Sequence, residues 1–435
     1  MPFDVIIGRN ESDKKDFGKR GLAFIGKTYV TMGSYTSLSN PVYLDIARSH
    51  VILISGKRGG GKSYTIGTMA ESLSNLGEEE SGNIASLIFD TMGIFWTMKF
   101  KNEKDRELLK EWGLEAKKIP LRVYAPMKHF DDYQEKGIEV DFPFAIKISE
   151  LSPADWLGLF ELDFTEPSAV LIESVISKLK EGGEPFGFDE INQLIKLAEN
   201  TSQETKNSTM ALFDAACEWG VFSKDEGTEI KNLVSAGKTT VIDLSMYSSI
   251  GNFNVRGLII GLVSKKLFDE RMSQRKSEEI FSIQHSGNYA SYSVQRETPL
   301  VWIFIDEAHE FLPLNGKTPA TDALVQILRE GRQPGISLVL ATQQPGKIHT
   351  DAMSQSDIVI SHRVTAQKDI EALNSITQSY LYESISEQIN KLPKLKGSAI
   401  ILDDNSERIY PVRIRPRFTW HGGEAPTAIK KTAEI

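Results

Sequence analysis

One stretch, residues 51–65, constrains the fold of this chain more than any other. It reads VILISGKRGGGKSYT. Its first residues are mostly branched and apolar, which is typical of a buried strand in a parallel sheet. Residues 56–63 then fit the pattern G-x-x-x-x-G-K-[ST], in which a glycine-rich turn joins a strand to a helix. The stretch therefore predicts a strand, a Walker A loop and a helix over about Ser63–Leu76, which together begin an α/β fold.

The glycine-rich turn has the composition that phosphate binding requires. Glycines let backbone N–H groups converge on phosphate oxygens, because they place no Cβ atoms in the way. Lys62 would reach the β- and γ-phosphates, the Ser63 hydroxyl would ligate Mg²⁺, and the positive end of the helix dipole would face the same phosphates. The alternative is a chance glycine-rich turn, but the flanking strand and helix are the context that the motif needs. We therefore expect ATP to be held by Gly56, Lys57, Arg58, Gly59, Gly60, Gly61, Lys62, Ser63 and Tyr64.

Composition limits the class of protein. The chain has 435 residues, enough for two or three domains at roughly 150 residues per domain. No apolar run reaches the roughly 18 residues that a membrane-spanning helix needs, and the N-terminus lacks a signal-peptide core. We therefore expect a cytoplasmic protein with no membrane segment. The net charge of −9 at pH 7 argues against coating of nucleic acid by the whole surface, but it leaves room for DNA in a local basic channel.

The single cysteine, Cys217, carries little chemistry. One cysteine excludes a disulfide within the chain and any cysteine-cluster metal site. We expect Cys217 to be a small buried residue, as free cysteines usually are.

The remaining pattern alternates strands and helices, interrupted by one helical stretch. Helical apolar spacing without a strand pattern predicts an insertion of about four helices, with Ser149, Ser152 and Asp189 as N-caps. A long helix over Val255–Lys276 leads into a polar surface excursion, 277–296. We predict an α/β fold with a mainly parallel sheet, divided into a small N-terminal β-rich element, 1–48; a first core part, 49–148; the helical insertion, 149–236; a second core part, 237–405; and a basic C-terminal tail, 406–435.

A second motif follows the insertion. Residues 300–307 read LVWIFIDE, a hydrophobic strand ending in two acids, which is the Walker B pattern. Asp306 would hold Mg²⁺, directly or through water, and Glu307 would orient and deprotonate the attacking water. Strands also end in solvated acids without function, but this one follows a Walker A motif in the same α/β chain. For His309 a metal site is one interpretation, and hydrogen-bonded scaffolding is the commoner one.

The segment after Walker B offers three more candidates. Gln343 comes just after a predicted buried strand, on the rim where ligands bind in open α/β sheets, and could sense the γ-phosphate or water. It could equally be an amide that caps a loop. Arg329 and Arg332 flank a predicted helix end at Gly331, where the helix dipole alone favours cations. The functional alternative is an arginine finger inserted into a neighbouring subunit's ATP site.

Three segments together resemble one family. They are LREGRQPGISLVLATQQP after Walker B, NPVYLDIARSHVILISGKRGGGKSYT around Walker A, and GSAIILDDNSERIYPVRIRPRFTWHGG near the C-terminus. The chain resembles HerA-type ATPases over roughly residues 20–422 and, more loosely, FtsK-type DNA translocases. The Walker motifs are shared by many ATPases, whereas the combination with Gly-Arg, Thr-Gln and an arginine-rich tail ending in HGG is more specific.

The resemblance implies a RecA-like P-loop NTPase core, a homo-hexameric ring, a central channel for double-stranded DNA and ATP-driven translocation. It implies that Lys62, Ser63, Asp306, Glu307 and Gln343 act within one subunit, with Arg332 or Arg329 acting on the next. Such ATPases often partner a NurA-type nuclease or another DNA-cutting effector.

Two departures from the family pattern limit what carries over. Gln344 stands where the family usually has an arginine after the sensor glutamine, so no role for that arginine carries over. The N-terminal barrel, which contributes to ring assembly and partner docking in the family, is compressed here into residues 1–48.

Contacts with DNA are the least constrained candidates. Phe95, Trp96 and Lys99 in one loop, and Lys317 after Walker B, could face a ring pore, because single positive charges repeated around a channel suffice to track phosphates. They could equally be ordinary loop and core residues. The basic stretch in the tail could contact DNA, form one solvated strand face, or, as the resemblance suggests, brace the next subunit near its nucleotide; it comprises Arg408, Arg413, Arg415 and Arg417.

Three functions fit these observations. The first is a hexameric ATPase motor that translocates double-stranded DNA and works with a nuclease in DNA processing or defence. The second is a regulatory ring ATPase that assembles and switches an attached nuclease or effector with little translocation of its own. The third, a small-molecule kinase on a P-loop fold, accounts less well for Walker B and for an arginine acting between subunits.

Overall fold

A computed structural model describes residues 3–32, 35–249, 254–284, 298–377, 388–389 and 391–424. Its centre is a 13-stranded sheet in the order β1-β3-β2-β15-β14-β13-β4-β12-β11-β5-β10-β6-β7. From β13 to β7 all neighbouring strands are parallel. These parallel strands are β4 (Val51–Ser55), β5 (Ile84–Asp90), β6 (Leu121–Pro126), β7 (Phe142–Phe144), β10 (Thr239–Asp243), β11 (Leu300–Ile305), β12 (Ile336–Thr342) and β13 (Ile358–His362).

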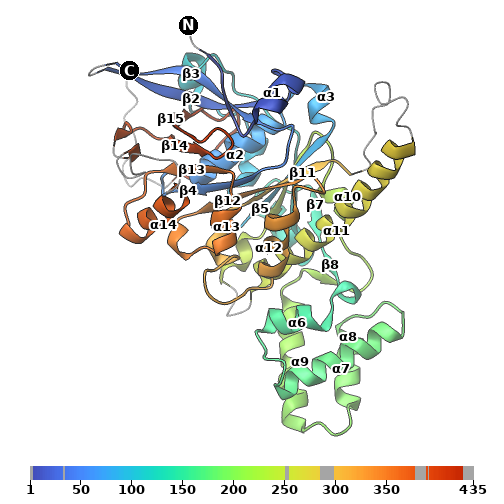
Figure 1. Cartoon of the computed structure of the whole chain (residues 1–435). Helices are drawn as coiled ribbons and strands as arrows, with labels where there is room; N and C mark the ends of the chain where they lie inside the picture. Colours follow the sequence, from blue (N-terminus) through green and yellow to red (C-terminus); the bar gives the residue numbers. More distant parts are fainter. Residues whose placement is uncertain are drawn as a thin grey trace.

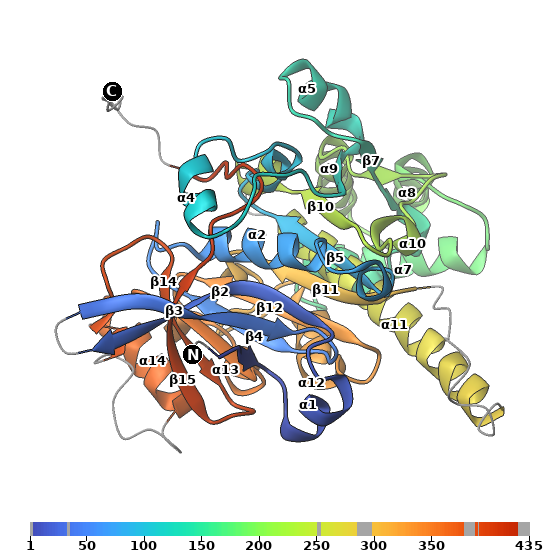
Figure 2. The same ribbon diagram turned by 90° about the horizontal axis from the view of Figure 1, so that it is seen from above.

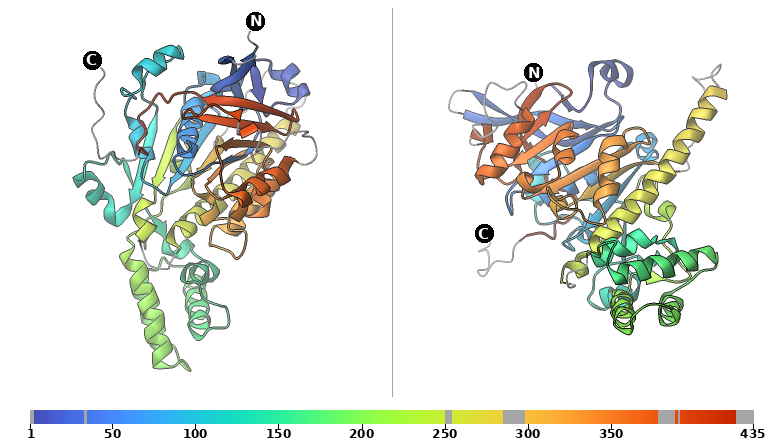
Figure 3. Two further views of the ribbon diagram at one scale, coloured as in Figure 1. Left: turned by 90° about the vertical axis from the view of Figure 1, so that its left-hand side faces the viewer. Right: turned by 60° about the horizontal axis from the view of Figure 1, so that its bottom comes forward.

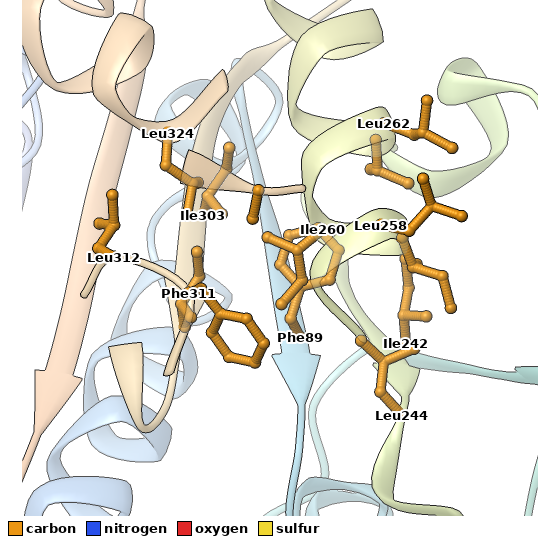
Figure 4. Packing of buried hydrophobic residues seen from close by; sticks show 14 of the residues in the cluster. Phe89, Ile242, Leu244, Leu258, Ile260, Leu262, Ile303, Phe311, Leu312 and Leu324 are labelled. Carbon is orange, nitrogen blue, oxygen red and sulfur yellow. The ribbon is translucent and has the colours of Figure 1, made fainter. Parts of the chain in front are cut away.

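Helices cover both faces of the parallel strands (Figure 1). On one face α2 (Lys62–Leu73) buries Ile66, Met69 and Leu73 in the cluster that contains Ile52 and Ile54 of β4. On the other face lie α11 (Val255–Gln284) and α12 (Thr321–Glu330), whose apolar side chains pack towards β5 and β11 around Phe89 and Ile303 (Figure 4). β4, β5 and β12 are buried at every position, which accounts for their mostly apolar sequences.

The N-terminal β-rich element joins this sheet instead of forming a barrel. Beyond β13 the sheet turns antiparallel through β14 (Ser398–Asp403), β15 (Arg408–Ile414), β2 (Leu22–Met32) and β3 (Tyr35–Asp45), and β1 (Val5–Ile7) pairs parallel to β3 at the edge. β2 is one continuous strand, with β15 paired on one side of it and β3 on the other. In Figure 2, β2 lies alongside α2, and Ser72 Oγ donates a hydrogen bond to the carbonyl of Phe24 (2.7 Å).

The helical stretch projects from the core as a bundle (Figures 1 and 3). Its helices are α6 (Pro153–Phe160), α7 (Pro167–Glu181), α8 (Phe188–Leu197) and α9 (Gln203–Glu218). Trp156 is fully buried at its centre and stacks on Phe160, with Phe213 packed edge-on at 5.0 Å. The two-stranded pair β8 (Ile146–Lys147) and β9 (Phe222–Ser223) lies where the chain leaves and re-enters the core.

Helix caps in the bundle only partly follow the sequence prediction. Ser152 caps α6 in a reciprocal capping box with Asp155. Ser149 lies inside a short 3₁₀ turn, Ile148–Glu150, and Asp189 lies in the first turn of α8 after the N-cap Gly187, so neither is an N-cap. Gly187 takes the cap position, and its backbone N–H donates to Glu190 Oε2 (2.8 Å), which is the half of a capping box that needs no side chain at the cap.

Cys217 is exposed, which corrects the prediction that it is buried. On α9 the buried positions are Thr209, Phe213 and Ala216, and the position one residue after Ala216 points away from the bundle core.

The long helix α11 continues to Gln284, eight residues further than predicted, and forms an arm that projects from the core (Figure 3). Most of the predicted surface excursion, 285–296, lies outside the described residues. No helix in the described part of the chain is both long and apolar enough to cross a bilayer. The remaining helical segments are α1 (Glu11–Phe17), α3 (Glu78–Ser81), η1 (Phe95–Lys99), α4 (Arg106–Glu111), η2 (Met127–His129), α5 (Phe130–Glu135), α10 (Ile230–Leu233), η4 (Ser245–Ser249), η6 (Ala308–Glu310), η7 (Pro345–Lys347), α13 (Thr350–Ser354) and α14 (Gln367–Thr377).

Candidate nucleotide site

Strand order brings the two Walker motifs to one edge of the sheet. β12 lies between β4, which leads into the Walker A loop, and β11, which leads into Walker B. The three strands are parallel, so their carboxyl ends meet at the same edge, where open α/β sheets bind ligands. Lys62, Gln343 and Asp306 therefore come from distant parts of the sequence to one site.

The Walker A loop presents its backbone to that site. Gly59 and Gly61 have φ values of +72° and +114°, which favour glycine. α2 begins at Lys62 and its N-cap, Gly61, has no side-chain capping bond. Because the first N–H groups of a helix have no partner within the helix, those of α2 remain available to an anion. Lys57 and Arg58 are exposed at the outer side of the loop.

Lys62 is almost entirely buried at the start of α2. Burial lowers the pKa of its ammonium below the usual value, while the nearby charges of Glu307 and Asp306 act to raise it. A buried cation beside two carboxylates, with unpaired N–H groups around it, is suited to an anion that carries several charges.

Ser63 and Asp306 face each other across the two motifs. Ser63 Oγ donates a hydrogen bond to Asp306 Oδ2. Burial raises the pKa of Asp306, and the bond from Ser63 acts in the opposite direction. A hydroxyl and a carboxylate oxygen side by side, next to the phosphate-binding loop, are the ligand types that Mg²⁺ prefers, so these residues fit the ion.

Glu307 is held in an unusual conformation with one oxygen unpaired. Its φ of +50° is rare for a residue with a side chain. Oε1 accepts a hydrogen bond from Gln343 Nε2, whereas Oε2 is buried, lies 3.6 Å from His309 Nδ1 and accepts no hydrogen bond among the described residues. Buried polar atoms are nearly always paired, so an unpaired carboxylate oxygen at this place points to a ligand or water that it would contact.

His309 joins the Walker B turn to the end of β12. Its Nδ1 lies 3.1 Å from Thr342 Oγ1, and its Nε2 lies 3.2 Å from Gln344 Nε2. This is the scaffolding role expected from sequence. No group of three or more potential metal-ligating side chains forms in the described ranges. Gln344, which stands where the family usually has an arginine, is thus turned towards His309 in this chain.

Arg332 lies at the opposite edge of the sheet. It is in the loop between α12 and the amino end of β12, and its guanidinium is 3.4 Å from Asp357 Oδ2, just before β13. Arg329, in the last turn of α12, pairs with Asp351 at 2.7 Å. Both side chains are more than half exposed, at 65% and 61%. Because β12 runs from one edge to the other, Arg332 cannot reach the nucleotide site of its own subunit.

The candidate DNA-contact residues differ in how exposed they are and in what they contact. Phe95 is fully buried (0% exposed) in the core cluster beneath η1, so the structure contradicts a pore contact for it. Burial follows because its N–H is tied to Asp90, which turns the side chain inward. Trp96 is half-buried and donates to the carbonyl of Gly93 (3.1 Å). Lys99 pairs with Asp141, and Lys317 is exposed and pairs with Asp322.

Two arginines of the C-terminal tail are buried, which overturns the prediction of a solvated strand face for them. Arg415 and Arg417 are fully buried and both pair with Glu71 of α2, at 3.1 and 2.9 Å. Burial acts to raise the pKa of Glu71, but the charges of Arg417 and Arg415 outweigh it and hold the pKa below its usual value. Gly67 of α2 lets Arg417 lie across the helix, since a Cβ there would be 2.5 Å from the guanidinium carbon.

The tail therefore packs on its own Walker A helix. The backbone N–H of Arg417 donates to the hydroxyl of Tyr64, one residue after Ser63, and His421 packs edge-on against the Tyr64 ring at 5.2 Å. Contacts within one subunit thus account for these residues. Arg413 is half-buried and Arg408 is exposed.

Sequence reasoning missed Glu71 and His362. Glu71 is a charged residue in a helix whose neighbours are apolar and buried, and that mismatch was a usable signal. His362 is fully buried next to the Walker A loop, and no local pattern marks it.

Comparison with known proteins agrees with this geometry. Residues 29–261, more than half of the chain, match the family described as "Helicase HerA, central domain". The probable DNA double-strand break repair helicase HerA of Methanocaldococcus jannaschii is 28% identical over 152 residues, which are 31% of this chain and 30% of that protein. The DNA double-strand break repair helicase HerA of Pyrococcus furiosus is 28% identical over 170 residues, 37% of this chain and 29% of the relative. This chain thus aligns with less than a third of the length of either protein.

Solved structures resemble the whole fold. VirB4 of Thermoanaerobacter pseudethanolicus has a TM-score of 0.55 at 13% identity, covering 92% of this chain and 98% of that one. The bacterial conjugative coupling protein TrwB has a TM-score of 0.50 at 13% identity, covering 97% and 95%. At this identity the likeness shows the fold alone, a RecA-like P-loop core. Since the Walker A strand, loop and helix lie within the matched residues and the sheet around them has this architecture, the chain belongs to the HerA helicase central-domain family.

Proposed function

We propose that this protein is an ATP-driven translocase of double-stranded DNA that works as a homo-hexameric ring. The observation that carries the proposal is the convergence of Lys62 and Ser63 with Asp306 and the Glu307–Gln343 pair at one edge of the sheet, while Arg332 lies exposed at the other. Membership of the HerA family supports the motor activity, and the relatives named as DNA repair helicases support DNA as the substrate.

The geometry supports ATP hydrolysis with defined roles for the residues. The loop N–H groups and Lys62 bind the β- and γ-phosphates. Ser63 and Asp306 would hold Mg²⁺, which neutralises phosphate charge when bound. Gln343 orients Glu307, whose unpaired Oε2 accepts a proton from water as the water oxygen bonds to the γ-phosphorus and the bond to the β–γ bridging oxygen breaks. The products are ADP and phosphate.

The position of Arg332 supports a ring. A cation that stabilises charge on the γ-phosphate must lie next to it, and Arg332 is a strand length away from its own site. If Arg332 acts on ATP, it acts on the site of a neighbouring subunit. Head-to-tail contacts of this kind close into rings, and the family resemblance favours six subunits.

The experiment is the rate of ATP hydrolysis by the purified protein with and without duplex DNA, followed by displacement of a bound protein or strand from naked DNA. We expect DNA to stimulate hydrolysis and ATP to drive displacement. Hydrolysis that DNA does not affect would refute a DNA motor and favour a small-molecule enzyme.

A second function, a regulatory ring ATPase that switches an attached effector, is supported by the helical bundle that projects from the core, since a motor ring needs no such extension to hydrolyse ATP (Figure 3). DNA-stimulated hydrolysis without displacement would favour it.

A NurA-type nuclease or another DNA-cutting effector is the partner that the family resemblance suggests. Co-purification of a nuclease activity with the full chain tests it.

A further inference from the structure

A buried histidine lies directly beneath the Walker A loop. His362 is the last residue of β13, which pairs with β4 so that Ser361 lies opposite Ser55. The next residues along the two strands are His362 and Gly56, the first glycine of the loop. His362 has no exposed surface (0%), so it cannot touch a nucleotide. Any effect of His362 on ATP must therefore pass through the loop.

The backbone of the Walker A loop packs against the side chain of His362. A Cβ atom at Gly56 would lie 2.8 Å from His362 Cβ, and one at Gly61 would lie 3.3 Å from its Cε1. A Cβ at Gly60 would be 3.6 Å from His362 Cβ. At Gly56 the histidine thus excludes a side chain, and at Gly61 it leaves little room for one; at Gly60 the closer contact is with the carbonyl oxygen of Lys57, at 2.9 Å.

Both ring nitrogens are bonded, and they join different parts of the fold. Nδ1 lies 3.1 Å from the carbonyl oxygen of Ser398 on β14, so Nδ1 carries the proton and donates. Nε2 is then the acceptor, 2.8 Å from Thr65 Oγ1 in the first turn of α2. The Thr65 hydroxyl also donates to the carbonyl of Gly61 (3.0 Å), so its one proton is shared between the histidine and the loop. Burial, with a smaller contribution from Lys62, lowers the pKa of His362 to about 4, which keeps the ring neutral.

A backbone bond holds the other end of the loop to the same strand. The N–H of Lys57, which follows Gly56, donates to the carbonyl of Arg363 at 3.1 Å. The end of β13 therefore contacts the loop where it leaves β4 and, through Thr65, where it enters α2.

We propose that His362 is a positioning residue that holds the Walker A loop and the first turn of α2 in the conformation that receives the phosphates of ATP. A glycine-rich loop loses more conformational entropy on ordering than any other sequence, and a rigid support removes that cost before the ligand arrives. The inference rests on the proposed binding of ATP at this loop.

Three variants of the full chain test it. His362→Asn keeps a donor for the Ser398 carbonyl and loses the acceptor for Thr65. Thr65→Val removes the hydroxyl partner and keeps the shape of the side chain. His50→Gln is the matched control, because His50 is also buried, directly precedes β4 at the end away from the loop, and forms none of its bonds with the loop. The measurements are equilibrium affinity for a fluorescent, slowly hydrolysed ATP analogue, the KM and kcat for ATP, and the melting temperature.

We expect His362→Asn and Thr65→Val each to weaken binding about tenfold, the value of roughly one hydrogen bond. KM should rise while kcat at saturating ATP changes little. The double variant should bind no more weakly than Thr65→Val alone, since Thr65→Val already removes the contact with His362 as well as the bond to the Gly61 carbonyl. His50→Gln should lower the melting temperature and leave the affinity unchanged.

Wild-type affinity in folded Thr65→Val protein would overturn the proposal, and it decides the matter even if His362→Asn fails to fold. So would a loss of affinity in His50→Gln equal to that in His362→Asn, because general destabilisation would then explain both. If the wild-type protein and Lys62→Ala bind the analogue equally, the failure lies in the proposed ATP site and not in the role of His362.

Discussion

At the carboxyl ends of β4, β11 and β12, polar groups gather around the uncapped first turn of α2. At the amino ends of β4, β12 and β13, buried His50 instead lies between two carboxylates of opposite charge, although its Nε2 and Asp45 Oδ2, 3.5 Å apart, form no hydrogen bond. The carboxyl edge holds the uncapped first turn of α2 and the unpaired Oε2 of Glu307. At the amino edge His50 Nδ1 lies 2.7 Å from Asp357 Oδ2, and Asp357 Oδ1 accepts from the N–H of Val51.

The difference between the two ends of the parallel strands indicates which end binds a ligand. Unpaired buried groups cost stability, and they persist where a ligand completes them. Paired buried groups hold strands in place and need nothing further. Arg332 is the exception at the amino edge, because it shares Asp357 with His50 and remains mostly exposed. A side chain that is only loosely held at a surface is free to serve a neighbouring subunit.

The largest effect should come from Lys62→Ala at the carboxyl edge. This change removes the buried cation that faces the phosphates and takes away no apolar packing, so ATP turnover should be abolished while the fold is kept. The measurement is steady-state ATPase rate, with circular dichroism as the check on folding. Normal hydrolysis in the folded variant would refute the assignment of the Walker A loop.

Arg332→Ala tests whether the amino edge contributes to hydrolysis. A finger supplied to a neighbour is worth about 10³–10⁵ in rate in other systems, so the homo-oligomer should bind ATP and hydrolyse it very poorly. Mixing with Lys62→Ala subunits should restore activity, because an intact Walker A site can then receive Arg332 from its neighbour. Arg329→Ala is the matched comparison, since Arg329 is similarly exposed and paired with Asp351.

The readout for that mixture is ATPase rate against mixing ratio after subunit exchange. Recovery with Arg332→Ala but not with Arg329→Ala would identify Arg332 as the finger. If verified mixed rings stay inactive at every ratio for both variants, neither arginine acts on a neighbouring site. Their roles are then limited to the ion pairs of Arg329 with Asp351 and of Arg332 with Asp357 near the end of α12.

Glu307→Gln tests whether Glu307, at the carboxyl ends of the strands, acts as the general base for hydrolysis. The amide cannot accept the proton of water, so hydrolysis should fall by about 10²–10⁴, the usual contribution of a general base. ATP binding should persist, because Glu307 contacts Gln343 and not the loop. Single-turnover hydrolysis and nucleotide affinity separate the two effects. A variant that no longer binds nucleotide would show that Glu307 is structural.

The smallest effect concerns His50 at the amino edge and depends on pH. Burial opposes charge on this ring, but the carboxylates of Asp357 and Asp45 raise its pKa from 6.5 to about 9. A raised folded-state pKa means that its contribution to stability is fully present below about pH 6.5 and is lost as the pH rises through about 9. Unfolding of wild type and His50→Gln by denaturant should therefore differ most at pH 6 and converge towards pH 9 and above. A constant difference between the two across this range would contradict a charged His50.

Much of the core could be predicted because its signals are local. The strand β4 follows from its run of branched apolar residues, and the Walker A loop from its glycine spacing. Walker B is also a local signal, a strand that ends in two acids. None of these needs knowledge of what lies opposite in space.

The sequence by itself determined that a glycine-rich loop with Walker A spacing joins a strand to a helix in an α/β chain, because strand burial and loop geometry are set by neighbouring residues. Only the tertiary structure decided which side chains meet. Alternating arginines look the same whether a strand face is solvated or, as for Arg415 and Arg417, covered by Glu71 of a helix more than 300 residues earlier. The support of the loop by His362 and the separation of Arg332 from its own site likewise depend on strand order, which arises from pairing between distant segments and leaves no local trace.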